Sequence, residues 1–338
     1  MYIDNKKLKN YISSWLILMF LIISIMIIIG GLTRLTDSGL SITQWQLFSG
    51  IIPPLTSESW NNYFNLYKKI PEYKLQNYSM TLDEFKIIFW WEWFHRFLGR
   101  LIGLFYLIPL LFFTLKLGYK KLINLYLIFF LICFQGFIGW YMVSSGLVDN
   151  VDVSHFRLSV HLLIAFLILS LILWNYLKIK IILNLNQKLK YNTPLILLFL
   201  IFLQIIIGAF VSGMDAGQIY NSWPLMGSSY FPDDNQIRNL FNLSAFNDPS
   251  LVQFIHRNLA YLILIFYLFV LIYIYKKNLN NYYYPIRLIG ILLIIQIILG
   301  ILTLINDAQI VLASMHQISS IFLVSSCVYL LFLNSNSN

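Results

Sequence analysis

The sequence predicts an all-α integral membrane protein with eight transmembrane helices, arranged as two four-helix bundles. Three observations predict this fold class: long apolar runs, basic residues concentrated in alternate loops, and an internal repeat. Of the 338 residues, 59% are hydrophobic and only 11% are charged. Such a composition, concentrated in runs of about 20 residues, is typical of membrane spans and excludes a soluble globular domain.

Eight apolar runs are long enough to cross a bilayer as helices, since about 20 residues span about 30 Å of hydrocarbon. They cover residues 13–33, 94–115, 122–143, 158–179, 194–212, 254–275, 286–305 and 310–333. The first run is too long for a secretory signal and lacks a small-residue cleavage site, so we interpret it as a span. Cys133 and Cys327 both fall near the middle of a predicted span, and we expect both to be buried as small apolar residues.

Basic residues gather in alternate loops, and this pattern predicts the orientation of the spans. The N-terminus and three loops contain 13 of the 23 basic residues but only one acid, Asp4. These basic residues are Lys6, Lys7, Lys9, Lys116, Lys120, Lys121, Lys178, Lys180, Lys188, Lys190, Lys276, Lys277 and Arg287. By the positive-inside rule, these segments and both termini face the cytoplasm. The net charge of +9 is therefore a topology signal, and we expect no nucleic-acid partner.

The two halves of the chain repeat each other. The segment "HRFLGRLIGL" at residue 95 is echoed by "HRNLAYLILI" at 256, and "QGFIG" at 135 by "QIILG" at 296, both 161 residues apart. The segments "HLLIAF" at 161 and "HQISSIF" at 316, and "TDSGLSITQW" at 36 and "MDAGQIYNSW" at 214, are also alike. We therefore predict two bundles, 1–185 and 186–338, related by a pseudo-twofold axis along the membrane normal. The long outer loops, 34–93 and 213–253, place the chemistry near the outer face.

Four histidines occupy equivalent places near the outer ends of helices, namely His95, His161, His256 and His316. His155 is the exception, because it falls in the short outer loop before the fourth span. A lone histidine in a helix is usually a hydrogen-bonded core residue, but ionisable groups inside a membrane are costly and usually functional. Two histidines in each bundle suit the two axial ligands of a haem iron, whereas zinc would require further ligands.

Neighbouring residues also suit a porphyrin. Four glycines would let a flat macrocycle approach the backbone, namely Gly99, Gly103, Gly136 and Gly139. Four arginines are candidates to bind haem propionates, because guanidinium pairs bidentately with carboxylate, and they are Arg34, Arg96, Arg100 and Arg257. The alternative for each arginine is a contact with a lipid headgroup.

Glu92 breaks the symmetry of the two histidine sites. It precedes His95 by three residues, so the two side chains share one face of a helix. The matching residue in the second half is Gln253, which can neither exchange a proton nor carry a charge. This difference favours a catalytic first half and a cofactor-binding second half. The alternative is an interfacial glutamate that merely pairs with Arg96 or Arg100.

Several blocks of the sequence resemble the haem A synthase family in order along the chain. They are "GGLTRLTDSGLSITQW", "EWFHRFLGRLIG", "RLSVHLLIAF", "FIHRNLAYLI" and "ASMHQISSIFL", between about Gly30 and Phe322. The resemblance implies eight helices in two pseudo-symmetric bundles, which agrees with the pattern of the spans. The chain has no loop cysteine, so it is similar to the branch found in proteobacteria and mitochondria. This favours a bacterial inner membrane, with the mitochondrial inner membrane as the alternative.

The resemblance further implies how the residues are used. His256 and His316 would bind a haem b cofactor, and His95 and His161 would hold the substrate, haem O. Glu92 matches the catalytic glutamate of the family. The implied reaction oxidises a porphyrin methyl group to a formyl group through two hydroxylations, with haem b as an electron relay. The expected partners are a haem O synthase that supplies the substrate and an external ferredoxin-like or quinol electron donor, with a second copy of the chain as a further candidate.

Two other functions account for part of the pattern. A di-haem b-type electron-transfer protein without catalysis explains the four histidines equally well, but not the contrast between Glu92 and Gln253. A transporter explains the internal repeat, but the sequence shows no broken helices with polar residues at the membrane midplane. Extraction of haems separates these classes, because only a synthase converts haem O to haem A.

Overall fold

A computed structural model describes residues 5–45, 49–147, 151–181 and 187–336 of the chain. Eight long helices in it are apolar enough to cross a membrane, which confirms the predicted spans and shows a multi-pass membrane protein. They are α1 (Lys6–Leu35), α4 (Leu82–Leu117), α5 (Ile123–Val143), α6 (His155–Lys180), α7 (Thr193–Gly213), α8 (Pro249–Lys276), α9 (Tyr283–Ile305) and α10 (Ile310–Ser335). The described residues contain no β-strand, so the fold is all-α as predicted.

Helix caps, rather than hydropathy, set where several helices begin. Helix α1 starts at Lys6, because the Asn5 side chain accepts hydrogen bonds from the backbone N–H groups of Lys7 and Leu8. Helix α4 begins at Leu82 with a capping box formed by Thr81 and Glu84, about three turns before the predicted span. The prediction that His155 lies in a loop is wrong, since this residue is the first of α6.

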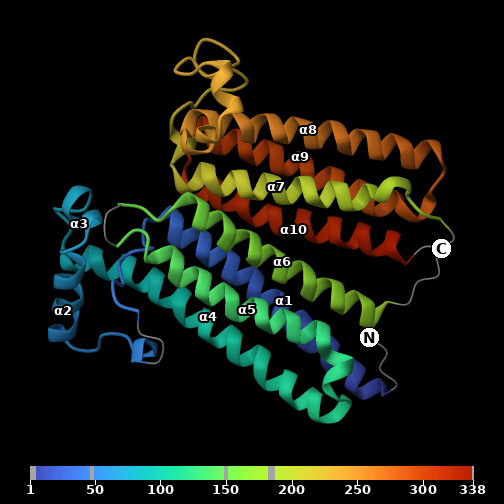
Figure 1. Cartoon of the computed structure of the whole chain (residues 1–338), viewed down its shortest axis with the longest axis horizontal. Coiled ribbons are helices and arrows are strands. Elements are labelled where there is room, and N and C mark those ends of the chain that lie inside the picture. Colours follow the sequence, from blue (N-terminus) through green and yellow to red (C-terminus); the bar gives the residue numbers. More distant parts are fainter. Residues whose placement is uncertain (1–4, 46–48, 148–150, 182–186, 337–338) are drawn as a thin grey trace.

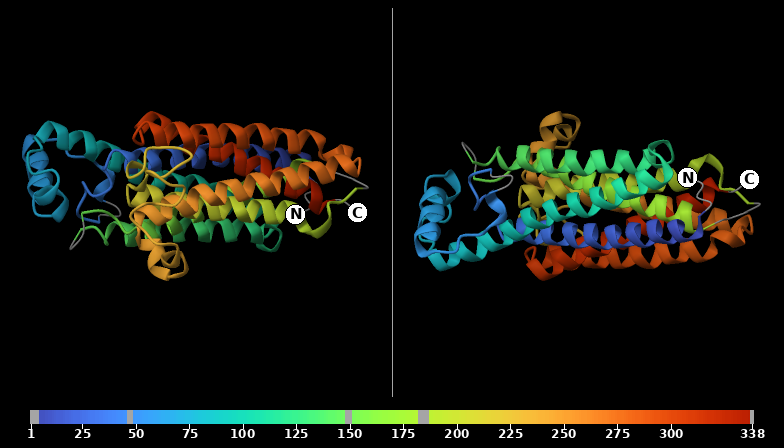
Figure 2. Two further views of the ribbon diagram at one scale, coloured as in Figure 1. Left: turned by 90° about the horizontal axis from the view of Figure 1, so that it is seen from above. Right: turned by 90° about the horizontal axis from the view of Figure 1, so that it is seen from below.

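The eight helices form two groups that lie side by side (Figures 1 and 2). Helices α1, α4, α5 and α6 form one group, and α7, α8, α9 and α10 form the other. The groups meet where α6 packs against α7 and α10, and where α1 packs against α10. Both marked chain ends lie at one end of the molecule (Figure 1), as an even number of spans requires. The predicted boundary at 185/186 and the lone inner acid Asp4 lie outside the described residues.

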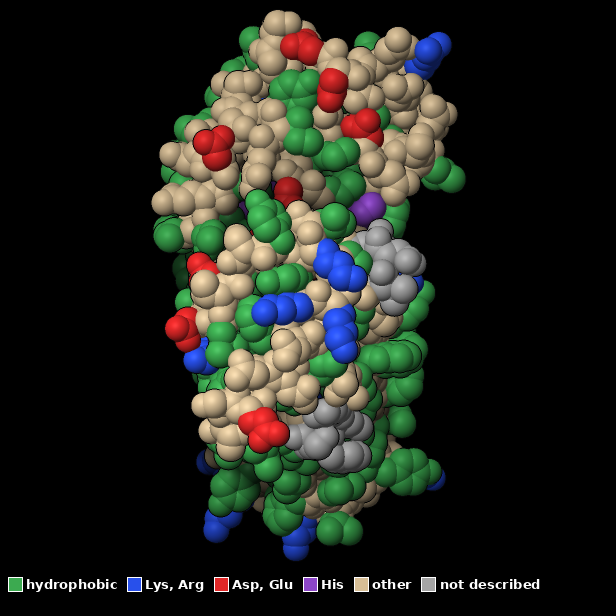
Figure 3. Space-filling view, turned by 90° about the vertical axis from the view of Figure 1, so that its left-hand side faces the viewer, with side chains coloured by type: hydrophobic (Ala, Val, Ile, Leu, Met, Phe, Trp, Pro, Cys, Tyr) green, Lys and Arg blue, Asp and Glu red, His purple; other side chains and the backbone are tan. Residues whose placement is uncertain are grey.

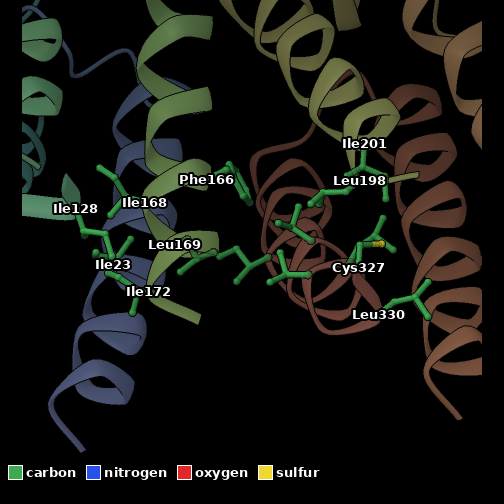
Figure 4. Close-up of a cluster of buried hydrophobic side chains, with 14 of the residues drawn as sticks. Ile23, Ile128, Phe166, Ile168, Leu169, Ile172, Leu198, Ile201, Cys327 and Leu330 are labelled. Atoms are coloured by element: carbon green, nitrogen blue, oxygen red, sulfur yellow. The ribbon is translucent and has the colours of Figure 1, made fainter. Parts of the chain in front are cut away.

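One continuous apolar core runs through both groups. Phe166 and Leu169 of α6 point toward the side of α10, where Cys327 and Leu330 are buried (Figure 4). Burial of Cys327 confirms its predicted place. Cys133 was expected to be buried as well, but it is exposed on α5. Residues of a span that face outward contact lipid, so an apolar residue at mid-span need not face the protein.

The same contacts recur in both groups at the 161-residue offset found in the sequence. The hydroxyl of Tyr106 on α4 donates to the backbone carbonyl of Leu125 at 3.1 Å. Its counterpart, Tyr267 on α8, donates to the carbonyl of Ile286 at 3.2 Å. Each tyrosine therefore joins the two neighbouring helices of its group at an equivalent point.

The first outer loop folds into a helical cap that the hydropathy pattern did not predict. It contains α2 (Ser57–Tyr67) and α3 (Pro71–Leu75), which lie beside the N-terminal end of α4 (Figure 1). A separate buried cluster holds the cap against α4, and it includes Phe64, Tyr67, Phe85 and Phe89. Viewed from this end, acidic and basic side chains are spread over the surface (Figure 3).

Glu72 makes the stability of this cap depend on pH. Its side chain is 3% exposed, Oε1 accepts from the Tyr67 hydroxyl at 3.0 Å, and Oε2 is buried without a hydrogen-bond partner. Burial raises the pKa of Glu72 to about 8 from the model-peptide value of 4.5. Between these two values only the folded cap holds the proton, so the folded cap loses stability as pH rises, by up to about 1.4 kcal/mol per pH unit.

We expect Glu72→Gln to remove this pH dependence, because an amide does not titrate. Hydrogen exchange of the α2 and α3 amides, corrected for the intrinsic rate, should show protection that falls from pH 5 to pH 8 in the wild type only. Glu58→Gln, on the exposed first turn of α2, is the control and should keep the wild-type pH response. An unchanged response in Glu72→Gln would show that another group is responsible.

Candidate functional site

The four predicted histidines lie in two pairs, one in each group of helices. His95 is on α4 and His161 on α6, while His256 is on α8 and His316 on α10. Within the first group both histidine-bearing helices pack against α1 and α5, and within the second group both pack against α7 and α9, so the two lie opposite each other in each group. His161 is an electrostatic neighbour of His95, and His316 of His256. The structure therefore brings together the pairs that the sequence indicated.

Each imidazole lies against a glycine on the preceding long helix. The pairs are Gly30 with His95, Gly139 with His161, Gly208 with His256, and Gly300 with His316. A Cβ atom added at any of these glycines would lie 3.0–3.1 Å from the Cε1 atom of the ring, closer than ordinary van der Waals contact. The glycines thus allow each ring to lie flush with the neighbouring backbone, with Nδ1 nearer to the glycine than Nε2.

A glutamine one helical turn before the glycine holds three of the four histidine helices. The side chains of Gln135, Gln204 and Gln296 donate to the backbone carbonyls of His161, His256 and His316, at 2.9, 3.0 and 3.0 Å. The pattern Gln-x-x-x-Gly therefore recurs at 135–139, 204–208 and 296–300, and the His95 site has Met26 in the glutamine position. The first and third copies were identified from the sequence, but the second was missed, although its spacing is the same.

Nε2 of each imidazole lies farther from the glycine than Nδ1 and is the candidate iron ligand; at His256 and His316 it lies 3.3 Å from the side-chain nitrogen of Gln204 or Gln296. The Nδ1 atoms of His95, His161 and His256 are buried without a hydrogen-bond partner, while Nδ1 of His316 lies 3.1 Å from the Gln296 carbonyl oxygen. Buried polar atoms without partners are rare and call for an explanation. Within the described part of the chain, no cluster of three or more His, Cys, Asp or Glu side chains could hold a metal ion. Paired imidazoles set against glycine backbones fit a flat bis-histidine haem better than a zinc ion.

Glu92 is buried and fully engaged at the outer end of the first site. Its side chain is 2% exposed, and Oε1 accepts from Arg96 Nη2 at 2.5 Å. Oε2 accepts from the Ser41 hydroxyl at 2.6 Å and from the backbone N–H of Ile42 at 2.7 Å. The carboxylate thus joins the loop after α1 to α4, one turn from His95.

Gln253 also holds an outer loop, but it donates a hydrogen bond to that loop, whereas Glu92 accepts hydrogen bonds from its loop. This side chain is 2% exposed as well, and its Nε2 donates to the backbone carbonyl of Tyr220 at 3.1 Å. Its Oε1 is buried without a partner. Two equivalent positions therefore do equivalent structural work, but only the first places a carboxylate beside a histidine pair.

Arg96 and Arg257 are both engaged with the outer loops. Arg96 Nη2 donates to the Ile42 carbonyl at 2.9 Å, and Arg257 Nη2 donates to the Tyr220 carbonyl at 2.8 Å. Arg96 and Arg100 also line a small cavity between α4 and the cap. Contacts from these three arginines to propionates stay predictions.

Arg34 bridges the two groups of helices at their outer ends. It pairs with Asp37 at 2.6 Å and with Asp215 at 3.0 Å, and it donates to the Ser212 carbonyl at 2.9 Å. These contacts tie the end of α1 to the end of α7. A propionate contact of Arg34 is likewise untested, and it would have to share donors that already have partners.

Neighbours of the two histidine pairs meet where α1 packs against α10. Gln317, next to His316, donates to the Ile27 carbonyl of α1 at 2.9 Å. Its side chain fills the space beside Gly31, where an added Cβ would lie 1.6 Å from the Gln317 Oε1 atom. Gly30, the neighbour of Gly31, contacts His95. The contact between Gln317 and Gly31 therefore connects the two histidine sites. His155 lies elsewhere, with Nε2 3.0 Å from the Phe246 carbonyl oxygen.

We expect Gly139→Ala to disturb the first histidine pair, because its new Cβ would press on the His161 ring. Phe137→Leu is a control on the same helix, because that side chain is exposed. Purified variants should be titrated with haem O and followed by absorbance. Gly139→Ala should bind roughly tenfold more weakly, about 1.4 kcal/mol, whereas Phe137→Leu should match the wild type. Equal affinities would show that the glycine contact does not matter for binding.

Comparisons with known proteins agree with these features. The model of the family described as COX15-CtaA, cytochrome oxidase assembly protein, matches residues 13–328. A curated protein of Pelagibacter ubique, named Heme A synthase, is 52% identical over 99% of this chain and 100% of its own length. Proteins of the same name from Rickettsia felis and Rickettsia prowazekii are 40% and 41% identical, each over 97% of this chain and 99% of their own length.

Proposed function

This chain belongs to the haem A synthase family, and from that premise we propose that it oxidises the methyl group of haem O to the formyl group of haem A. The overall change comprises two successive hydroxylations of one carbon, and each would consume one O2, two electrons and two protons and release one water. The first converts the methyl group to a hydroxymethyl group, and the second gives a geminal diol that loses water to leave the aldehyde. Its relatives are named Heme A synthase, which supports the overall reaction. The arrangement of this chain's own residues supports the way the reaction would be carried out.

The observation that carries the proposal is the difference between two otherwise matching sites. Both contain a histidine pair, glycines in contact with the rings, and an arginine bound to outer-loop carbonyls. Only the first adds a buried carboxylate, Glu92, where the second has Gln253. A pure electron carrier needs no such difference, whereas proton-coupled oxidation at one haem and not at the other does.

His256 and His316 would hold a haem b cofactor in the second group of helices. When bound, haem b supplies one-electron transfer, because its iron cycles between two oxidation states. The protein's contribution is to position both imidazoles, which Gly208 and Gly300 do by contact and Gln204 and Gln296 do by hydrogen bonds. The sequence has no flavin or nicotinamide fingerprint, so the electrons would come from a ferredoxin-like protein or a quinol.

His95 and His161 would hold the substrate so that its reacting methyl group lies near Glu92. The carboxylate is fixed by Arg96 and by the Ser41 and Ile42 donors, so its position does not depend on the substrate. From there Glu92 would accept or donate a proton during hydroxylation, or stabilise developing positive charge. Because Glu92 is 2% exposed, its carboxylate is shielded from bulk water.

We further propose that the protein lies in the bacterial inner membrane with both termini in the cytoplasm. Lysines of the inner loops and acids of the outer loops support this orientation. Reporter fusions near Asp83 and Asp233 should give outer-compartment signals, and a fusion near Lys188 should give a cytoplasmic signal. Inverted signals would overturn the orientation and the claim that the histidines lie near the outer face.

Chromatography of extracted haems tests the proposed activity. The protein should be expressed in a bacterium that makes haem O but lacks its own haem A synthase, with an inactive variant as the control. Haem A should appear only with the active chain. If haem b is bound at both histidine pairs and haem O is left unchanged, the chain would instead be the di-haem electron carrier that the four histidines also suit.

A further inference from the structure

An apolar groove opens between the inner halves of α8 and α9, far from the outer ends where the histidines lie. It is lined by Leu271, Ile272, Gly290, Ile291 and Ile294. The Tyr267 side chain lies so close to α9 that a Cβ on Gly290 would be 2.1 Å from its hydroxyl oxygen. That contact, together with the hydrogen bond from the Tyr267 hydroxyl to the Ile286 carbonyl, joins the two helices beside the groove.

The inner end of the groove is positively charged. Arg287 and Lys276 both line it, and both are exposed. Arg287 Nε donates to the Tyr275 hydroxyl at 2.6 Å, and its guanidinium lies over the Tyr275 and Tyr283 rings, which stack at 4.5 Å. In the part of the chain that the structure describes, neither cation has a carboxylate partner. The aromatic contacts orient the guanidinium and leave its terminal nitrogens available.

The first group of helices has an equivalent contact between α4 and α5, but this contact contains no charged side chain. At the 161-residue offset, Thr114 matches Tyr275, Tyr126 matches Arg287, and Leu115 matches Lys276. Thr114 and Tyr126 form a neutral hydrogen bond of 2.8 Å where the second group has the bond between Tyr275 and Arg287. The fold therefore does not require a cation at this contact, and the placing of two cations beside an apolar groove is particular to the second group.

We propose that this groove binds one anionic phospholipid of the inner leaflet. An acyl chain would lie against the apolar walls, and the phosphate would be bound by Arg287 and Lys276. Guanidinium groups pair bidentately with phosphate oxygens, and basic pockets between spans on the cytoplasmic side are suited to anionic headgroups. The proposal depends on the orientation inferred above but not on any haem chemistry.

Native mass spectrometry of the purified full chain tests the site. The protein should be delipidated in mild detergent and then offered phosphatidylglycerol or phosphatidylcholine with the same acyl chains. The wild type should retain one phosphatidylglycerol with at least a roughly tenfold preference over phosphatidylcholine. Arg287→Gln with Lys276→Gln should lose that preference, because both phosphate donors are removed.

Two further variants separate the groove from general surface charge. Lys120→Gln with Lys121→Gln removes the same charge from exposed positions in the α4–α5 connection, and it should keep wild-type binding. Ile294→Trp fills the apolar groove from an exposed position and should weaken retention while keeping both cations. The proposal fails if the Arg287/Lys276 variant binds phosphatidylglycerol as well as the wild type, if the Lys120/Lys121 variant loses as much, or if phosphatidylcholine binds equally.

Discussion

Replacing His256 or His316 by alanine should remove haem b from the purified protein. Each substitution deletes one of two axial ligands from a site whose rings are held by glycine contacts and glutamine hydrogen bonds. Loss of a mere supporting residue lowers metal affinity 10- to 100-fold, so loss of a ligand should lower haem b content at least about tenfold. The haem b content per chain should be measured as the pyridine haemochrome.

Two controls locate the effect in the second group of helices. His95→Ala and His161→Ala remove equivalent ligands from the other pair and should leave haem b content near that of the wild type. His155→Gln changes a histidine that contacts the Phe246 carbonyl rather than another imidazole, and it should also keep haem b. The assignment is wrong if His95→Ala loses as much haem b as His256→Ala, or if neither second-group variant loses any.

The spans and the histidine positions could be predicted because both depend on local sequence. An apolar run of about 20 residues has few structures open to it other than a membrane helix. The offset of 161 residues relates His95 to His256 directly, and the structure adds matching contacts for Tyr106 and Tyr267 at the same offset. The internal repeat therefore identified the histidine sites, which a single histidine in a helix would not have done.

The contacts that build the sites were less accessible to sequence reasoning, because they depend on which helices are neighbours. The approach of Gln317 to Gly31 joins residues that are far apart in the chain. The arginines were considered as propionate ligands because guanidinium pairs bidentately with carboxylate, but Arg34 already has carboxylate partners on two segments of the chain. The cap helices were missed because their aromatic residues bury against one another rather than forming a long apolar run.

The sequence left two roles open for Glu92, a catalytic acid or an ion-pair partner. The structure shows that Glu92 is at least the ion-pair partner of Arg96. Its bond to Arg96 is 2.5 Å long, and breaking a buried pair by removing one partner costs about 3–5 kcal/mol in general. Arg96 would keep its bonds to the Ile42 and Gln44 carbonyls. A test of Glu92 must therefore separate chemistry from the anchoring of the loop.

Glu92→Gln should stop haem A formation while leaving haem b content unchanged. Gln253 shows that an amide can hold an outer loop at this position, so the bundle should still assemble. The amide cannot exchange a proton, and loss of general acid–base catalysis slows each hydroxylation roughly 100-fold or more. Extracted haems should contain haem O or its hydroxylated intermediate in place of haem A.

Ser41→Ala is the matched control, because it removes one donor to the Glu92 carboxylate and leaves the carboxylate with Arg96 and Ile42. It should cost about 1 kcal/mol in loop stability and reduce haem A formation only slightly. Hydrogen exchange of residues 38–45 would report the loosening of the loop in both variants. If Ser41→Ala loosens the loop as much as Glu92→Gln and stops haem A formation as completely, then anchoring explains the requirement. If Glu92→Gln makes haem A at the wild-type rate, proton transfer by this residue is ruled out, and the asymmetry between the two sites must have another cause.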